Sequence, residues 1–187
     1  MKTLEAIRES LPAYARDLQL NLGAVLTPAG APGLTETQIW AIALASAVAS
    51  RNAAFTRDIE SVARAALDAE HVRAAYSAAA IMGMNNVYYR FLHLVGVAEY
   101  AQMPARLRMN VIGNPGIARL DFELLCLAVS AINGCGKCIE AHEKHLRTDN
   151  VSREAIQSAV RIAATVHAVA RVLENPVAAQ AEAVRAA

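Results

Sequence analysis

Residues 120–142 read LDFELLCLAVSAINGCGKCIEAH, and this stretch decides both the fold class and the candidate chemistry. The apolar run from Leu120 to Ile132 predicts a buried helix, and Asn133-Gly134 predicts a turn. A second helix is expected to begin at about Cys135. The sequence therefore predicts two consecutive helices with a thiol at their junction.

The remainder of the chain also has helical patterns. Thr35 and Gln38 form a capping-box pattern that opens a helix towards Ser50, and Ser152 is expected to cap another helix, which Pro176 should end. Pro/Gly-rich segments predict loops, and further helical stretches are expected at 4–18 (with Pro12 inside it), 55–67 and 70–92. No stretch shows the alternation of a strand, so we predict an all-α fold and a single domain spanning residues 1–187.

A weak internal repeat relates the two halves of the chain. Sliding the first half by 85 positions places Gln38 on Glu123 and Ser50 on Cys135. The two copies would span roughly residues 35–95 and 118–175, with thiols only in the second copy. Chance similarity between alanine-rich helices stays open as an alternative to a duplicated helical unit whose first copy is a scaffold.

Composition excludes several classes of function. The formal net charge is +1, so nothing predicts a nucleic-acid partner. Hydrophobic residues make up 55% of the chain, but many are alanine, and the apolar stretch Trp40–Ala49 is too short to span a bilayer. The charged N-terminal residues are unlike a signal peptide, and three cysteines do not form a secreted disulfide framework. We therefore expect a cytoplasmic protein with no membrane segment.

Four residues make up the candidate active site: Glu123, Cys135, Cys138 and His142. On a helix, the two cysteines and His142 lie one turn apart, within mutual reach. The pair Cys135 and Cys138 can close a small disulfide. Glu123 interrupts an apolar run, where a carboxylate is costly to bury without a partner.

These residue types favour thiol redox chemistry. A thiolate attacks peroxides and disulfides, and thiolates are favoured at helix N-termini, where Cys135 is expected. Lys137 adds a positive charge that modulates the thiols. His142 could accept the proton of Cys138, and Glu123 could orient or recharge the imidazole. Once one sulfur is oxidised, the other can resolve it as a disulfide.

Other interpretations of these residues are weaker. The four candidate residues could ligate zinc, but a structural site usually combines two separated ligand pairs, so we predict no metal. Cys126, within the apolar helix, is expected to be a core thiol. Cys135 and Cys138 are expected to be accessible, because Gly134, Gly136 and Lys137 make their surroundings polar. The Asn pair of Met82-Gly-Met-Asn-Asn86 could line a pocket or cap a bend, and we favour the structural interpretation. The remaining histidines are expected on the surface or in packing, without such neighbours: His71, His93, His145 and His167.

The same residues carry a resemblance to a known family. The chain resembles the alkylhydroperoxidase D (AhpD) family, within the carboxymuconolactone decarboxylase-like superfamily. The most specific part is the spacing Glu-x11-Cys-x2-Cys-x3-His. The matching stretches are Leu11-Pro-Ala-Tyr-Ala-Arg-Asp-Leu18, Ala80-Ile-Met-Gly-Met-Asn-Asn-Val-Tyr-Tyr89, Leu107-Arg-Met-Asn110, Asn114-Pro-Gly116, Phe122-Glu-Leu124 and Val129-Ser-Ala-Ile-Asn-Gly-Cys135.

The resemblance implies an all-helical fold built from a duplicated unit and assembled as a homotrimer. It implies an antioxidant enzyme, a thiol-dependent peroxidase that reduces organic hydroperoxides and regenerates a peroxiredoxin of the alkyl hydroperoxide reductase C type. The implied reductant is dihydrolipoamide, with no bound cofactor. It would come from a lipoyl-bearing acyltransferase recharged by a lipoamide dehydrogenase.

The family roles carry over to individual positions. Cys138 resembles the peroxidatic thiol, which forms the sulfenic acid and the mixed disulfide with peroxiredoxin, and Cys135 resembles the resolving thiol and proton donor. Glu123 and His142 match the proton relay. Several family members have His between the cysteines where this chain has Lys137, which implies a charge contribution there without proton transfer. Decarboxylase or lactone chemistry, known in the wider superfamily, leaves the paired thiols unexplained.

Overall fold

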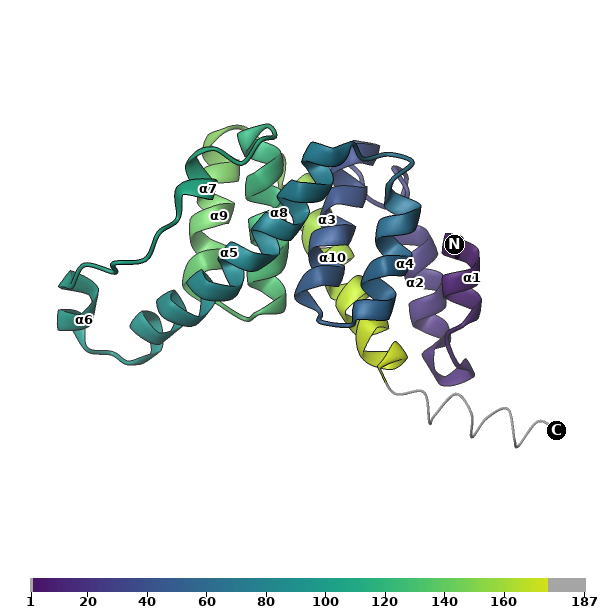
Figure 1. Cartoon of the computed structure of the whole chain (residues 1–187), viewed down its shortest axis with the longest axis horizontal. Helices are drawn as coiled ribbons and strands as arrows, with labels where there is room; N and C mark the ends of the chain where they lie inside the picture. Colours follow the sequence, from purple (N-terminus) through teal and green to yellow (C-terminus); the bar gives the residue numbers. More distant parts are fainter. Residues whose placement is uncertain (1, 175–187) are drawn as a thin grey trace.

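The computed structural model describes residues 2–174, and every regular element in that range is helical (Figure 1), which confirms the all-α prediction. Pro176, expected to end the last helix, lies outside the described residues. The elements in chain order are α1 (Leu4–Glu9), the 3-10 turn η1 (Ala13–Ala15), α2 (Arg16–Val25), α3 (Glu36–Ala49), α4 (Ala53–Ala63), α5 (Ala69–Leu94), α6 (Ala98–Gln102), α7 (Asn110–Gly113), α8 (Arg119–Ile132), α9 (Gly136–Thr148) and α10 (Arg153–Leu173).

Helices α3 and α8 pack against each other at the centre of the molecule, and each also packs against α5 and α10. α3 is buried over most of its length, from Ile39 to Ala47, and α8 is buried from Phe122 to Ser130. A helix that is apolar on all sides belongs in a core rather than at a surface. The central position of α8 therefore buries Glu123, the one acidic residue within that buried run.

Local sequence signals set where several helices begin. Thr35 and Gln38 form the predicted capping box at the start of α3, and Ser152 caps α10 by accepting a hydrogen bond from a backbone N–H. Pro12 divides the predicted helix at 4–18, because proline lacks an N–H and its ring clashes with the preceding turn. α1 therefore ends at Glu9, and the 3-10 turn η1 precedes α2.

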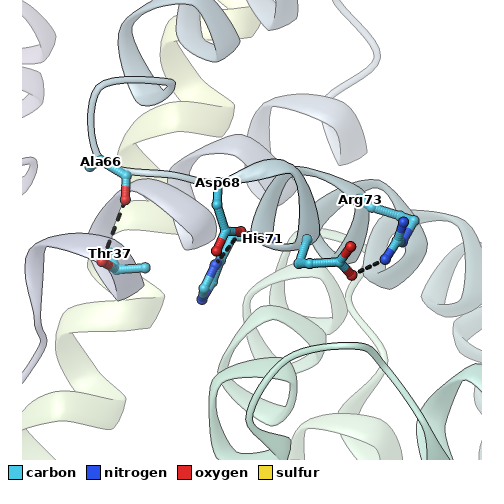
Figure 2. Close-up of polar contacts among 6 residues, drawn as sticks. Thr37, Ala66, Asp68, His71 and Arg73 are labelled. Atoms are coloured by element: carbon cyan, nitrogen blue, oxygen red, sulfur yellow. Dashed lines mark hydrogen bonds and ion pairs between the residues drawn. The ribbon is translucent and has the colours of Figure 1, made fainter.

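Polar contacts fix the start of α5, the 26-residue helix that forms one wall of the site described below. Figure 2 shows Asp68 accepting a hydrogen bond from the backbone N–H of His71 at 2.9 Å, with its Oδ1 2.8 Å from His71 Nδ1. The backbone hydrogen bond from His71 holds the pKa of the Asp68 carboxyl below its ordinary value. The hydroxyl of Thr37 on α3 donates to the Ala66 carbonyl. His71 therefore has a carboxylate neighbour that the sequence analysis did not expect.

The turns α3–α4 and α8–α9 share their local geometry. Asn52 caps α4 and Cys135 caps α9, and each side chain accepts a hydrogen bond from the N–H three residues later. Arg51 and Gly134, directly before these caps, have left-handed φ angles of 64° and 67°. The members of each pair are 83 positions apart, two fewer than the sequence offset suggested. The likeness supports a duplicated helical unit, which stays a prediction.

The segment between α5 and α8 forms an arm that projects from the helical body (Figure 1). It contains the short helices α6 and α7, which the sequence analysis did not predict because neither is long enough to show a helical period. None of the helices within residues 2–174 is both long and apolar enough to cross a membrane.

Candidate active site

The thiol pair lies where α8 ends and α9 begins. Cys135 is the N-cap of α9, and its sulfur accepts a hydrogen bond from the Cys138 N–H at 3.4 Å. The structure joins the two residues by a disulfide, with their Cα atoms 5.3 Å apart. Because the first turn of a helix presents unpaired N–H groups, this position stabilises a negative charge on sulfur when the disulfide is reduced.

Both cysteines are buried, so the prediction that polar neighbours make them accessible is wrong. Cys135 is 0% exposed and Cys138 is 6% exposed, whereas Gly136 and Lys137 between them face solvent. The reason is helical geometry: positions three apart share one face, and the residues between them point elsewhere. Polar composition around a thiol therefore did not predict its exposure.

A cavity of about 160 Å³ lies between α5 and α9. Its lining residues are Met82, Asn85, Tyr89, Lys137, Cys138, Ala141 and His142. The cavity is therefore lined by two of the predicted site residues, Cys138 and His142, and by Met82 and Asn85 of the Met82–Asn86 stretch on α5. The interpretation of the Asn pair as purely structural is wrong for Asn85, because this side chain forms part of the cavity wall.

Glu123 and His142 form a buried, hydrogen-bonded pair that joins α8 to α9. The distance from His142 Nδ1 to Glu123 Oε2 is 2.6 Å. An ionised carboxylate only accepts hydrogen bonds, so Nδ1 carries the proton and donates it. The other ring nitrogen, Nε2, lies 3.3 Å from the sulfur of Met82, in the wall of the cavity that Cys138 also lines.

The charge state of Glu123 is set by opposing effects. Burial on α8 raises the pKa of this carboxyl, but the hydrogen bond and charge of His142 outweigh it, with a smaller contribution from His145. The pKa of Glu123 therefore lies below its ordinary value. Glu123 is ionised at neutral pH and is a permanent acceptor for the imidazole of His142.

His145 is a site residue that the sequence analysis missed. Its Nδ1 lies 3.4 Å from Glu123 Oε1, and its side chain is 51% exposed. The expectation that His145 has no such neighbour is therefore wrong. The sequence pattern that could have predicted this role is the position of His145 three residues after His142, which places both imidazoles on one face of α9. Glu123 thus contacts one buried histidine and one that reaches solvent.

A metal-binding arrangement exists, but it differs from the zinc set considered above. Among the described residues, possible ligand atoms of Glu123, His142 and His145 lie within 4.8 Å of one another. The two cysteines are joined to each other and do not offer thiolates in this state. The three grouped side chains instead pair with one another through the carboxylate.

A second polar network holds the turn that precedes the thiols. Asn86 on α5 donates through Nδ2 to Ser130 Oγ at 2.9 Å and accepts from Asn133 Nδ2 at 2.9 Å. Arg90 donates to the Asn133 carbonyl at 2.6 Å. These bonds connect α5 with the end of α8, so the α8–α9 turn has a fixed position relative to the cavity wall.

Cys126 has none of these features. It is a buried free cysteine on α8, as predicted for a core thiol. Burial and the nearby charge of Glu123 raise the pKa of this thiol far above its ordinary value. It therefore stays protonated and unreactive at neutral pH.

Comparisons with known proteins identify a family for this chain. The sequence model of a protein family described as "Carboxymuconolactone decarboxylase family" matches residues 98–182. A protein from Rhodospirillum centenum named "Alkyl hydroperoxide reductase AhpD" is 56% identical over 172 residues, covering 92% of this chain and 91% of the relative. Proteins of the same name from Gluconacetobacter diazotrophicus and Hyphomonas neptunium are each 53% identical, covering 94% and 96% of this chain and 95% and 98% of the relatives.

We expect Glu123→Gln to lower the free energy of unfolding by about 1.5–3 kcal/mol at neutral pH, the usual range for a hydrogen bond to a charged group. Because the pKa of Glu123 is lowered in the folded protein, its stabilisation is fully present above the ordinary glutamate pKa and is lost as pH falls through the lowered value. The difference between wild type and variant should therefore shrink below about pH 4. Urea unfolding followed by circular dichroism measures it.

Glu140→Gln is the matched control, because Glu140 is an exposed acidic residue on α9. This control should change stability by less than about 0.5 kcal/mol. A loss for Glu123→Gln that stays constant from neutral to acidic pH would contradict the ionised pair.

Proposed function

Since this chain belongs to the alkyl hydroperoxide reductase AhpD family, we propose that its Cys135–Cys138 pair reduces organic hydroperoxides and regenerates a partner peroxiredoxin. The observation that carries the proposal is that one small cavity is lined by both Cys138 and His142. Cys135 forms a disulfide with Cys138, and Glu123 accepts a hydrogen bond from His142. A nucleophile, a resolving thiol and an acid–base group therefore lie at one place.

Cys138 is the thiol that attacks the hydroperoxide. It lines the cavity, whereas Cys135 is completely buried at the helix cap. His142 takes the proton of the Cys138 thiol on Nε2, and the resulting thiolate forms a bond to the terminal oxygen as the O–O bond breaks, so sulfur is oxidised to the sulfenic acid. The alkoxide leaves and takes a proton from His142, which Glu123 holds in place, to become the alcohol.

Cys135 resolves the sulfenic acid. Its sulfur attacks the sulfur of Cys138, the S–S bond forms as the S–O bond breaks, and the hydroxyl group leaves as water with the proton that the Cys135 thiol gives up. The Cα separation of 5.3 Å is within the usual range for disulfides, so this step needs no large movement of the backbone. The disulfide of the structure supports this assignment as the product of the oxidative half of the cycle.

Dihydrolipoamide restores the two thiols by thiol–disulfide exchange. One of its thiolates attacks a sulfur of the protein disulfide, and the second displaces the mixed disulfide, so lipoamide leaves in the oxidised form. In this proposal, a lipoyl-bearing acyltransferase presents the group and a lipoamide dehydrogenase reduces it again. The reduced pair reacts in the same way with an oxidised peroxiredoxin, and Cys138 forms the mixed disulfide because it faces the cavity.

Lys137 modulates the thiols through its charge. It is exposed at the start of α9, it lines the cavity beside Cys138, and no ion pair of its ammonium occurs within residues 2–174. A nearby positive charge favours the thiolate over the thiol. Proton transfer in this proposal belongs to His142.

Self-association as a homotrimer is part of the proposal, and an exposed apolar surface supports it. Large hydrophobic side chains are exposed at the end of α5 and in the segment that follows it. Figure 1 shows this segment as the projecting arm. The exposed side chains are Val87, Phe91, Leu94, Val97, Tyr100 and Met103. A concentration of exposed apolar side chains in one segment is typical of a protein–protein contact.

Two other functions fit the site less well. Decarboxylase chemistry, which the name of the matching family model mentions, gives no role to a resolving thiol next to the nucleophile. A zinc-stabilised scaffold would need free thiolates at Cys135 and Cys138, whereas the structure joins them as a disulfide. Thiol peroxidase chemistry gives a role to every residue of the predicted site.

Serine variants of the two cysteines test the assigned roles. The assay couples NADH oxidation to cumene hydroperoxide through lipoamide dehydrogenase and lipoamide, with and without a peroxiredoxin. We expect Cys138→Ser to abolish hydroperoxide-dependent NADH oxidation, because the nucleophile is lost. Cys135→Ser should also stop turnover, but it should still consume one equivalent of hydroperoxide and leave a trappable sulfenic acid.

Cys126→Ala is the control for these variants and should retain turnover, because the buried Cys126 is outside the cavity. Retention of most activity by Cys138→Ser would refute the assignment of the nucleophile. If wild type fails to oxidise NADH in the presence of hydroperoxide, the proposed function itself is wrong.

The relay is tested by Glu123→Gln, His142→Ala and the double variant. Each single variant should slow turnover by roughly 10²–10⁴-fold, the usual effect of losing positioned acid–base help. The double variant should be little slower than the slower single variant, because residues that act as one unit lose their effect together. Steady-state rates provide the comparison, and fully additive effects would rule out a shared relay.

A further inference from the structure

The cavity wall contains a polar side chain that the described part of the chain leaves without a partner. Asn85 is only 4% exposed, and its Oδ1 is buried with no hydrogen-bond partner. A buried amide oxygen without a partner costs about 1–3 kcal/mol relative to its hydrated state. Such a group in a native protein calls for an explanation, and a bound molecule is one of the few available.

The neighbouring asparagine shows what a structural role requires. Asn86, one position further along α5, donates to Ser130 and accepts from Asn133, so both ends of its amide are bonded. Asn85 is on the same helix and is also buried, but it lines the cavity. The two adjacent amides therefore have different tasks.

The surroundings of Asn85 indicate what it binds. Cys138 and His142 line the same cavity, and the wall also contains Met82, Tyr89 and Ala141. A molecule in this space meets a nucleophilic sulfur, an imidazole and an acceptor oxygen together with largely apolar groups. An organic hydroperoxide fits this set, because it combines one O–H donor with an alkyl group.

We propose that Asn85 binds the hydroperoxide group of the substrate through Oδ1, which accepts a hydrogen bond from the terminal O–H. This inference rests on the proposed function. The terminal oxygen is the atom that Cys138 attacks, and it keeps its proton while the S–O bond forms and the O–O bond breaks. Asn85 therefore holds this oxygen against the sulfur before the reaction and accepts from the sulfenic acid O–H afterwards.

The two polar groups of the wall then serve different oxygens of the substrate. Asn85 offers an acceptor to the terminal oxygen, which carries a hydrogen throughout. His142 offers a proton to the second oxygen, which leaves as an alkoxide and becomes the alcohol. The alkyl group on that second oxygen contacts the apolar wall. Asn85 is thus a substrate-binding residue that sets which end of the hydroperoxide faces Cys138.

The test separates the two half-reactions of the enzyme. Asn85→Leu replaces the amide with an apolar group of similar shape. We expect the second-order rate of oxidation of the reduced variant by cumene hydroperoxide, measured by rapid mixing, to fall about 10- to 100-fold, the effect of losing one hydrogen bond to the reacting group. Reduction of the oxidised variant by dihydrolipoamide should stay within about threefold of wild type, since no hydroperoxide is bound in that step.

The midpoint of thermal unfolding distinguishes a binding role from a structural role, because loss of a structural residue would lower this midpoint. Asn85→Leu should keep or raise the midpoint of unfolding, because it removes an unpaired buried polar atom. Asn86→Leu, the matched variant, should lower the midpoint, because it leaves Ser130 and Asn133 without their bonds.

Oxidation of Asn85→Leu at the wild-type rate would overturn the inference, and so would an equal slowing of both half-reactions. In either case wild type would still turn over hydroperoxide, so the proposed function would stand. If reduced wild type fails to react with hydroperoxide, the failure lies with the proposed function.

Discussion

The hydrogen bond between the buried Glu123 carboxylate and His142 is the constraint on which the site depends. Glu123 is on α8, a helix buried along most of its length, where a carboxylate without a partner would be strongly destabilising. Its partner comes from α9, at 2.6 Å. Satisfying this one carboxylate fixes the rotation and position of α9 against α8, and with them the thiols at the N-terminus of α9.

Burial alone does not produce the proposed reactivity, and the three cysteines of the chain show why. Cys126 and Cys135 are both buried, yet Cys126 sits inside a helix, where burial and the nearby negative charge of Glu123 raise the pKa of its thiol. Cys135 caps a helix, and Cys138 lies in the first turn beside a cavity. Backbone N–H groups favour the thiolate there. Position relative to helix ends and charges, more than exposure, separates the reactive pair from the inert thiol.

Sequence patterns predicted what depends on local order. Short-range signals predicted the capping box at Thr35, the cap at Ser152 and the all-helical fold. The free-energy cost of burying an unpaired carboxylate correctly predicted a partner for Glu123. Features made by packing between helices were missed. His145 on α9 contacts Glu123 on the neighbouring helix α8. Asn85 lines the cavity between α5 and α9, while the adjacent Asn86 bonds to Ser130 on α8. Nothing in the sequence distinguishes these two asparagines, because their partners come from other elements.

The central claim is that Cys135 and Cys138 act as one redox unit while Cys126 stays inert. The most direct test is a thiol count on the fully reduced wild-type protein, before and after one equivalent of an organic hydroperoxide, with the modified cysteines located by mass spectrometry. The account predicts that Cys135 and Cys138 lose their thiols together and become linked to each other, while Cys126 stays reduced. Loss of a single thiol, of none, or of Cys126 in place of the pair would contradict it.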